Sequence, residues 1–562
     1  MTPLRRALPG LFAAFLALVV LAPVAGAPGT DVAGVATVDA YGTWWFQWWV
    51  AHAVSTGQSP LFTDLIFYPW GKDILTHTGG NVLDAALIVP FRLLLGPAAA
   101  ANLLVFAIVA TNAGAAGAWA RRLGHDLPSV LVAELLVGLH PFVLDELARG
   151  RPTQAILAPV IVALAAGDAA FQTGNRRAAA LAAVALALAG WIYWYAAGFA
   201  ALGLVVLAAG RPLVKRSTNP AIVGFGSLVL TLPMVIPLAT ALASGEVPGL
   251  LPVHEWLAGK AEFVNAQGGA VQLSTLDTHG GAGFETSEGR VPEGLALGVV
   301  TLAMALAGPW RWRAVALLGL AVAFGPFPGG HPNPLYLGLV AGLPPFARLY
   351  WPIRAVALLV PAAALGAVGL LARVPVRARP WAAAALAAAL AGEVALRGGL
   401  PIGAWRPTVP EALDCLRAEG GAGIILPYGY DQVPLVWQAG LGLPMLNGMA
   451  ERSLSLVPKA QQELRADNGW IRSILLAPTD PRGELSWTEE EKAAIGAMGY
   501  RWVVLRPEAL YEPGSRANPK GRARAAMRVL EKPLGAPLRV TDEVVIYAPW
   551  GGLDACRAGT SR

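Results

Sequence analysis

The chain has 562 residues, of which 55% are hydrophobic and only 14% are charged, and its mean hydropathy is +0.53. A soluble protein carries nearly twice that charged fraction, so the composition excludes an ordinary soluble protein and favours an integral membrane protein with many spans. The net charge of +6 does not indicate a nucleic-acid partner. The arginines stand in short pairs between apolar runs, as they do in cytoplasmic loops under the positive-inside rule.

The basic pairs predict a topology. Basic segments are assigned to the inside, and segments rich in acids, tryptophan, glycine or proline are assigned to the outside. The two kinds alternate along the chain without a break, which gives about eleven spans. The N-terminus is then cytoplasmic and the residues after 398 are extracytoplasmic. Residues 82–97 must form a non-spanning or re-entrant helix. The N-terminus also resembles a secretory signal with a small-residue site at 25–27, and cleavage there is the alternative to an uncleaved first span.

A tryptophan-rich segment follows the first apolar run and opens with Asp39. Its four tryptophans share one face of a helix, because their spacings fit 3.6 residues per turn. They are Trp44, Trp45, Trp48 and Trp49. Tryptophan prefers the membrane–water boundary, so we expect this helix to lie in that interface. Asp39 is therefore a candidate for chemistry just outside the bilayer, and an N-cap of the helix is its structural alternative.

Two domains are predicted. Residues 1–398 form the transmembrane domain, with residues 28–83 as its first periplasmic loop, and residues 399–562 form a small soluble periplasmic α/β domain. In this tail AGIILPYG and YRWVVLR predict strands, DQVPLVWQAGLG predicts a helix, and LRVTDEVVIYAPW predicts a closing strand pair. The tail sequence contains no glycine-rich phosphate loop and no metal-ligand spacing.

Both cysteines of the chain, Cys415 and Cys556, fall in the predicted soluble domain. An extracytoplasmic tail lies in an oxidising space, where the two would form one disulfide. Two unpaired cysteines are the alternative, since Cys556 stands near the end of the chain.

Several motifs resemble one family. The first loop runs from Asp39 through the tryptophan helix to FYPWG and His77. Two later motifs are LHPFVLDELARGRPTQAIL and PNPLYLGLVAGLPPFARLYWPIRAVALL. The tail contains LPYG, LPMLNGMAERS and GYRWVVLR. This order resembles the GT-C superfamily, polytopic glycosyltransferases that use lipid-phosphate sugars. The nearest subgroup is bacterial and has a C-terminal periplasmic domain. The resemblance implies a GT-C-like fold in the bacterial inner membrane, with Asp39 as catalytic base. The loop lacks the acid-x-acid pair that metal-dependent members use, so no divalent metal or other cofactor is supported.

Transfer from a polyprenyl phosphate also needs a cation for the leaving phosphate, and arginine supplies paired donors. Four arginines lie at predicted outer ends of spans, against the positive-inside bias, so an anionic ligand is one reason for them. They are Arg149, Arg151, Arg348 and Arg354. Snorkelling, or pairing with Asp145, Glu146 or lipid headgroups, is the alternative. Gln154 could add a neutral hydrogen bond. His77 is a candidate polar group of the site, with a structural histidine as its alternative.

These observations predict an enzyme that moves a sugar from a polyprenyl-phosphate donor to a glycan, lipid or protein acceptor outside the cytoplasm. Membrane lipid, donor and acceptor are the expected partners. A non-catalytic GT-C-like scaffold or lipid-glycan binder in envelope assembly is the alternative. A transporter is less favoured, because no inverted repeat is visible and we expect acids such as Glu134 to lie close enough to a span end to reach water.

Overall fold

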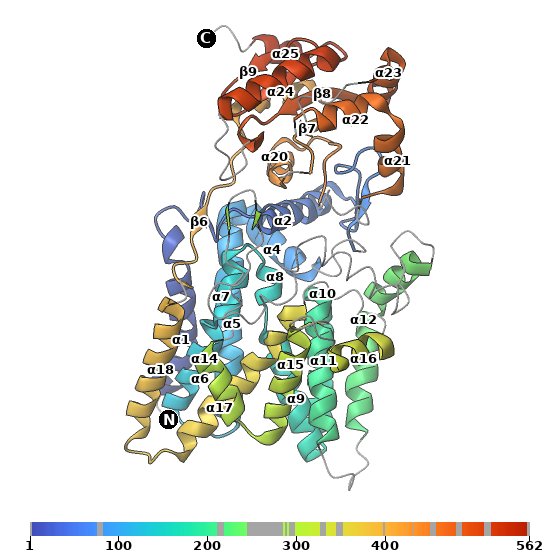
Figure 1. The fold of residues 1–562 in the computed structure, drawn as a ribbon. Helices are drawn as coiled ribbons and strands as arrows, with labels where there is room; N and C mark the ends of the chain where they lie inside the picture. The colour runs from blue at the N-terminus through green and yellow to red at the C-terminus, as the bar shows by residue number, and fades with distance from the viewer. Residues whose placement is uncertain are drawn as a thin grey trace. The chain divides into compact units, whose positions relative to one another are not determined.

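The computed structural model describes residues 3–75, 82–210, 218–243, 285–286, 289–290, 298–325, 333–343, 352–396, 399–429, 431–449, 457–478, 486–510 and 519–558. The chain divides into two compact units. The helical unit takes its residues from 1–36, 79–284 and 290–405, and the C-terminal unit takes its residues from 37–78, 285–289 and 406–562. The two units are drawn in Figure 1 and are described separately below.

The helical unit consists almost entirely of helices. Its elements are α1 (Pro3–Val20), η1 (Ala22–Val24), β1 (Val32–Ala33), α4 (Val82–Leu95), α5 (Pro97–Arg122), α6 (Leu127–Gly138), α7 (Pro141–Ala148), α8 (Pro152–Ala155), α9 (Ala158–Thr173), α10 (Arg176–Ile192), α11 (Trp194–Ala209), α12 (Asn219–Ala243), α14 (Val299–Ala307), α15 (Trp310–Ala323), α16 (Pro334–Gly342), η4 (Pro352–Leu358), α17 (Leu359–Arg373), α18 (Arg379–Leu396) and β6 (Ala404–Trp405). Strand β1 pairs with β6 in an antiparallel manner.

Five helical segments of the described residues are long and apolar enough to cross a membrane. They are Pro97–Arg122, Leu127–Ala148, Pro152–Thr173, Asn219–Thr240 and Pro352–Arg373. The prediction of about eleven spans exceeds this number, and the apolar helices Arg6–Val20 and Trp194–Ala209 are shorter. Helix α4, the predicted non-spanning helix, has 14 residues and is not among the five, since a span needs about 20.

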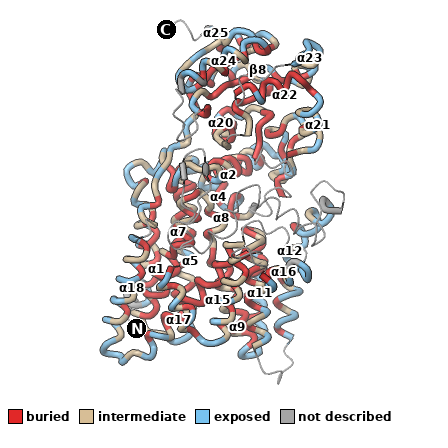
Figure 2. The backbone as a smooth tube through the Cα atoms, viewed as in Figure 1, coloured by how far each residue is buried: buried red, intermediate tan, exposed pale blue. Residues whose placement is uncertain are grey.

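Small side chains let the helices approach closely. Helix α10 packs on α9, α11 and α12, which run side by side in Figure 1. Ala178, Ala179 and Ala182 of α10 are buried in this contact region, as expected where helices pack without bulky side chains between them. Buried residues run along α5 and α17 in Figure 2, whereas α12 presents many exposed apolar side chains, the pattern of a helix that faces lipid.

Glu134 is buried where α6 packs on α5. Its side chain is fully enclosed, and neither carboxyl oxygen has a hydrogen-bond partner among the described residues. Gly117 of α5 leaves the space that the carboxyl group fills, because a Cβ at that position would overlap Glu134 Oε1. Glu134 therefore does not reach water, which corrects the expectation from the sequence.

Gly117→Ala is expected to destabilise the helical unit by about 1–3 kcal/mol, because the added methyl overlaps the Glu134 carboxyl group. In a Glu134→Ala background the same change should cost much less. Thermal unfolding of the four proteins in detergent measures this cycle. Equal costs in both backgrounds would show that the overlap is not the cause.

The C-terminal unit combines a mixed sheet with short helices. Its elements are α2 (Val38–Thr56), β2 (Phe62–Thr63), β3 (Lys72–Asp73), β4 (Glu285–Thr286), η5 (Glu411–Leu413), α19 (Asp414–Glu419), β7 (Ala422–Leu426), α20 (Val433–Leu441), α21 (Lys459–Asp467), α22 (Gly469–Leu476), α23 (Glu489–Ala497), β8 (Tyr500–Leu505), η7 (Glu508–Leu510), α24 (Pro519–Leu534), β9 (Arg539–Val540), β10 (Val545–Tyr547) and α25 (Asp554–Ala558). The short strand β5 (Gly289–Arg290), at the boundary of the two units, pairs with β4.

The main sheet has the strand order β7-β8-β10-β9. Strand β7 is parallel to β8, and β10 is antiparallel to β8 and β9. All five residues of β7 are buried, which explains its continuous apolar sequence. The helix and strand predictions in AGIILPYG, DQVPLVWQAGLG, YRWVVLR and the closing strand pair are confirmed by β7, α20, β8 and β9–β10.

Cys415 of α19 and Cys556 of α25 form a disulfide, with their Cα atoms 5.0 Å apart and 141 residues apart in the sequence. Cys415→Ser is expected to lower the stability of the C-terminal unit by up to about 5 kcal/mol, the chain-entropy value for so long a loop. The thermal midpoint of the oxidised protein should fall, and reductant should lower the wild-type midpoint to the same value. A midpoint insensitive to both changes would contradict this expectation.

Candidate functional site

The N-cap of helix α2 lies two residues before Asp39, the residue expected to cap it. Thr37 is the N-cap: the Ala40 N–H donates to its Oγ1 at 3.1 Å. Asp39 lies in the first turn and is exposed, so the N-cap interpretation of Asp39 is wrong. Its negative charge near a helix N-terminus is nevertheless favourable, because the helix dipole is positive there. The carboxylate is thus anchored by its helix and reachable by a molecule in solution.

The tryptophan face of α2 is largely enclosed by protein. Trp45 and Trp49 are fully buried and stack with ring centroids 6.2 Å apart. The Trp49 indole donates to the Pro60 carbonyl oxygen at 3.0 Å, and the Trp45 indole donates to Gln438 Oε1 of α20. These two side chains therefore belong to the core of the C-terminal unit rather than to a membrane interface. An interfacial position for Trp44 and Trp48 stays a prediction.

The loop after α2 joins the same unit through backbone hydrogen bonds. The Met445 N–H donates to the Leu65 carbonyl oxygen at 2.9 Å, the Phe67 N–H to Asn447 at 3.0 Å, and the Tyr68 N–H to Met445 at 3.0 Å. The sequence predicts residues 28–83 as part of the transmembrane domain. In the structure residues 37–78 group with residues 406–562 instead.

Three of the arginine candidates form one charged cluster in the helical unit, which we call the arginine cluster. Arg149 Nε lies 2.9 Å from Asp145 Oδ1. Glu146 is buried and pairs with Arg151 Nε at 3.3 Å and with Arg354 Nε at 3.0 Å. Glu146 thus joins the guanidinium groups of Arg151 and Arg354, which lie 203 positions apart in the sequence (354 − 151).

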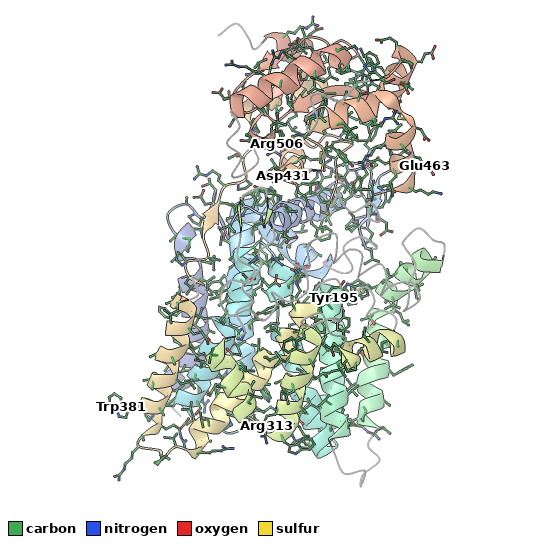
Figure 3. All side chains as sticks on the ribbon, in the orientation of Figure 1. Tyr195, Arg313, Trp381, Asp431, Glu463 and Arg506 are labelled. Atoms are coloured by element: carbon green, nitrogen blue, oxygen red, sulfur yellow. A yellow bond between two sulfur atoms is a disulfide. The ribbon has the colours of Figure 1, made fainter. Side chains whose placement is uncertain are left out.

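Aromatic residues complete the surroundings of Arg354. Its NH1 donates to the Tyr193 hydroxyl at 2.8 Å, and its guanidinium lies 5.6 Å from the centroid of that ring. Tyr193 has an extended backbone conformation between α10 and α11. This break between the two helices directs the Tyr193 side chain toward Arg354. Tyr195, labelled in Figure 3, lies with its ring centroid 5.1 Å from that of Tyr193.

A buried asparagine fixes the backbone beside Arg151. Asn112 of α5 donates to the Ala155 carbonyl oxygen at 2.7 Å and accepts from the N–H groups of Leu157 and Ala158 at 2.9 and 2.8 Å. These contacts satisfy the backbone polar groups at the break between α8 and α9, which would be costly to leave unpaired in an apolar environment. Helix α8, which carries Gln154, is thereby held in place.

The arginine cluster contains more guanidinium groups than carboxylates among its described members. Its described members are three guanidinium groups and two carboxylates, which gives a formal charge of +1. Gln154 lies on α8, three residues after Arg151, and is partly buried. Arg348 and His77, the other two candidates, lie outside the described residues.

Asp84 is a further acid of the helical unit and is not among the candidates from the sequence. It lies in the first turn of α4, is buried, and accepts a hydrogen bond from Thr153 Oγ1 of α8 at 2.9 Å. Burial raises the pKa of Asp84 to about 7, although the Thr153 hydrogen bond acts in the opposite direction. The only sequence signal was its position in an apolar helix, where an acid needs a partner.

The described residues contain no group of three or more His, Cys, Asp or Glu side chains placed to hold a metal ion.

Comparison with known proteins gives structural matches only. No protein-family model and no curated protein matches the sequence. The fold matches arabinofuranosyltransferase AftD from mycobacteria with a TM-score of 0.52 and 20% identity, over 97% of this chain and 42% of AftD. It also matches oligosaccharyltransferase AglB from Archaeoglobus fulgidus, solved with an inhibitory peptide and a dolichol-phosphate, with a TM-score of 0.50 and 12% identity, over 98% of this chain and 75% of AglB.

The chain therefore spans less than half the length of AftD, and at these identities the matches establish the fold alone. Both matched proteins are GT-C membrane glycosyltransferases. Together with the apolar helices, the matches support a multi-pass membrane protein that shares the fold of AftD and AglB.

Proposed function

We propose that this protein is a glycosyltransferase that moves a sugar from a polyprenyl-phosphate donor to a glycan, lipid or protein acceptor on the outer side of the bacterial inner membrane. The observation that carries the proposal is the arginine cluster in a GT-C fold. Three guanidiniums gathered at the ends of apolar helical segments suit the phosphate of a lipid-linked donor, because arginine offers paired N–H donors.

In the proposed reaction Asp39 is the general base. Its carboxylate takes the proton of an acceptor hydroxyl while that oxygen bonds to the anomeric carbon of the donor sugar. The bond between the anomeric carbon and the phosphate oxygen breaks, and the electron pair leaves with the polyprenyl phosphate. A guanidinium of the arginine cluster stabilises the added negative charge through paired N–H donors.

The chain itself limits where Asp39 can act. The Val35 N–H donates to the Ala148 carbonyl oxygen at 2.6 Å, next to Arg149. Only three residues lie between Val35 and Asp39, so their Cα atoms are at most about 14 Å apart. This covalent limit supports a role for Asp39 in chemistry on a ligand of the arginine cluster.

Among the three guanidiniums, Arg149 is the best candidate to contact the phosphate. Its partner Asp145 has a third of its side chain exposed, whereas Glu146, the partner of Arg151 and Arg354, is almost fully enclosed. Exchanging a partly exposed carboxylate for a phosphate costs less than breaking a buried pair. Arg354 and Arg151 then supply positive charge from fixed positions.

The matched proteins guide the choice of donor. AftD is an arabinofuranosyltransferase and AglB was solved with a dolichol-phosphate, so a lipid-linked pentofuranose is the first donor to test. We propose no metal or other cofactor, because the first loop lacks an acid-x-acid pair.

The test uses the purified full chain in a neutral detergent with a panel of farnesyl-phosphate sugars: arabinofuranose, mannose, glucose and galactofuranose. Mass spectrometry measures sugar release and transfer to added oligosaccharides. Turnover of one donor supports the proposal. Saturable donor binding without release or transfer would favour the scaffold or lipid-glycan binder, and flux into proteoliposomes without transfer would favour a transporter.

A further inference from the structure

The loop that follows α2 extends the sheet of the C-terminal unit. Asn447 pairs with the backbone of Ile425 in β7: the Ile425 N–H donates to Asn447 Oδ1 at 2.8 Å, and Asn447 Nδ2 donates to the Ile425 carbonyl oxygen at 3.0 Å. On its other side the Asn447 carbonyl oxygen accepts from the Phe67 N–H. Residues 65–68 thus continue a hydrogen-bonded series that starts at β7, at its edge away from β8.

Phe67 is held in an unusual backbone conformation by this contact. Its φ is +53°, in the left-handed region that residues with a side chain rarely adopt, and its ring is fully buried. Gly448 packs against the face of the ring, where a Cβ would overlap the aromatic carbons. The protein therefore maintains this docking at a conformational cost, which indicates that the position of the loop matters.

Helix α20 packs on α2 within the C-terminal unit. Hydrogen bonds and an ion pair hold the start of α20 in place. Arg506, at the end of β8, pairs with Asp431 at 2.6 Å, and Figure 3 shows the two labelled side by side. The Arg506 guanidinium lies 5.3 Å from the ring centroid of Trp437 of α20. Asp431 in turn accepts from the Val433 N–H at 3.0 Å, at the start of α20. These contacts hold the start of α20 rigidly, so a side chain on α20 has a fixed position.

Gln438 connects helix α20 to helix α2. It is 1% exposed. Its Oε1 accepts from the Trp45 indole N–H, and its Nε2 donates to the carbonyl oxygens of Leu65 and of Leu443. The orientation of the amide is fixed, because an indole N–H can only donate and a carbonyl oxygen can only accept. One buried amide thus bonds helix α2, the loop after it and the turn after α20.

We propose that Gln438 is a positioning residue, which fixes helix α2 on the C-terminal unit and thereby sets the direction in which Asp39 presents its carboxylate. The inference rests on the proposed function, in which Asp39 is the base. Asp39 lies less than two helical turns from Trp45, so a tilt of α2 about the Gln438 contact moves the carboxylate. Misplacing a reacting group by about 1 Å can cost about 100-fold in rate.

The test compares Gln438→Met, Trp45→Phe and the double variant with wild type, using the full chain in detergent. Methionine keeps the volume of the side chain and removes all three hydrogen bonds, and phenylalanine removes the indole N–H. Hydrogen exchange of the α2 amides should speed up by about 10-fold or more in Gln438→Met. With the most active farnesyl-phosphate sugar, kcat should fall by about 10- to 100-fold while KM changes by less than about twofold. The double variant should be little slower than the slower single variant.

Trp470→Phe is the matched control. Trp470 is also fully buried in the C-terminal unit, and its indole donates to the Pro533 carbonyl oxygen at 3.2 Å. Its loss should lower the thermal midpoint but leave α2 exchange and kcat within about twofold of wild type. An equal fall of kcat in this control would mean that Gln438 acts only through overall stability, which would overturn the inference.

Two further outcomes separate this inference from the proposed function. The inference fails if hydrogen exchange of α2 is unchanged in Gln438→Met, or if exchange speeds up while kcat is unchanged. In either case Gln438 does not position Asp39, but the proposed glycosyltransferase function is not contradicted. If Asp39→Asn remains active, the assignment of the base fails whatever Gln438 does. Loss of activity in Asp39→Asn with unchanged α2 exchange, beside the expected Gln438→Met result, supports both.

Discussion

Asp39→Asn is expected to lower the rate of sugar transfer by about 10²- to 10⁴-fold, the usual contribution of a general base. Asparagine cannot accept the proton of the acceptor hydroxyl, but it keeps the size of the side chain. The helix keeps its N-cap, because Thr37 rather than Asp39 caps it. Initial rates with a farnesyl-phosphate sugar, measured with excess acceptor, give the result, and the thermal midpoint should stay within about 2 °C of wild type.

Asp64→Asn is the control for this experiment. Asp64 is an exposed acid of the same segment, and its replacement changes the formal charge by the same amount. Its rate should remain close to wild type. Full activity in Asp39→Asn, or equal losses in the two variants, would remove Asp39 from the mechanism.

Glu146→Ala is expected to destabilise the helical unit by about 3–5 kcal/mol. Glu146 pairs with Arg354 and Arg151, and its loss leaves two guanidinium groups in a largely enclosed site without this carboxylate. The thermal midpoint and the yield of folded protein in detergent should both fall. A second change, Arg354→Ala, should restore part of the loss, because it removes one of the charges that Glu146 had balanced.

Asp145→Ala is the comparison for Glu146→Ala. Asp145 is the neighbouring acid, and a third of its side chain is exposed, so its loss should cost less than the loss of the enclosed Glu146, which balances two guanidinium groups. Similar losses for Asp145→Ala and Glu146→Ala would show that enclosure of Glu146 does not determine its contribution.

The sequence allowed the secondary structure of the C-terminal unit to be predicted because its signals are local. The apolar runs of β7 and β8 are each readable within about ten residues. The arginines at predicted outer span ends also stood out, because positive charge there departs from the usual bias, and the structure brings three of them into one cluster. The sequence did not indicate that Glu146 would join Arg151 to Arg354, because that contact depends on tertiary packing.

The environment of the tryptophan helix could not be predicted in the same way. A face of four tryptophans suits a membrane interface and a protein core equally well, because both are apolar and offer acceptors for the indole N–H. Gln438, the partner of Trp45, lies 393 residues later in the chain. The shift of the N-cap from Asp39 to Thr37 has a simpler cause: both residue types are good caps, and boundaries are uncertain by one or two residues.

The separation of 393 residues between Trp45 and Gln438 has a consequence for biosynthesis. At about 5–20 residues per second, the ribosome completes the partner of α2 some 20–80 s after α2 itself has been made. During that interval the Trp45 indole lacks the hydrogen-bond partner that it has in the finished protein. The contact that fixes α2 through Trp45 can therefore form only after most of the chain has been made.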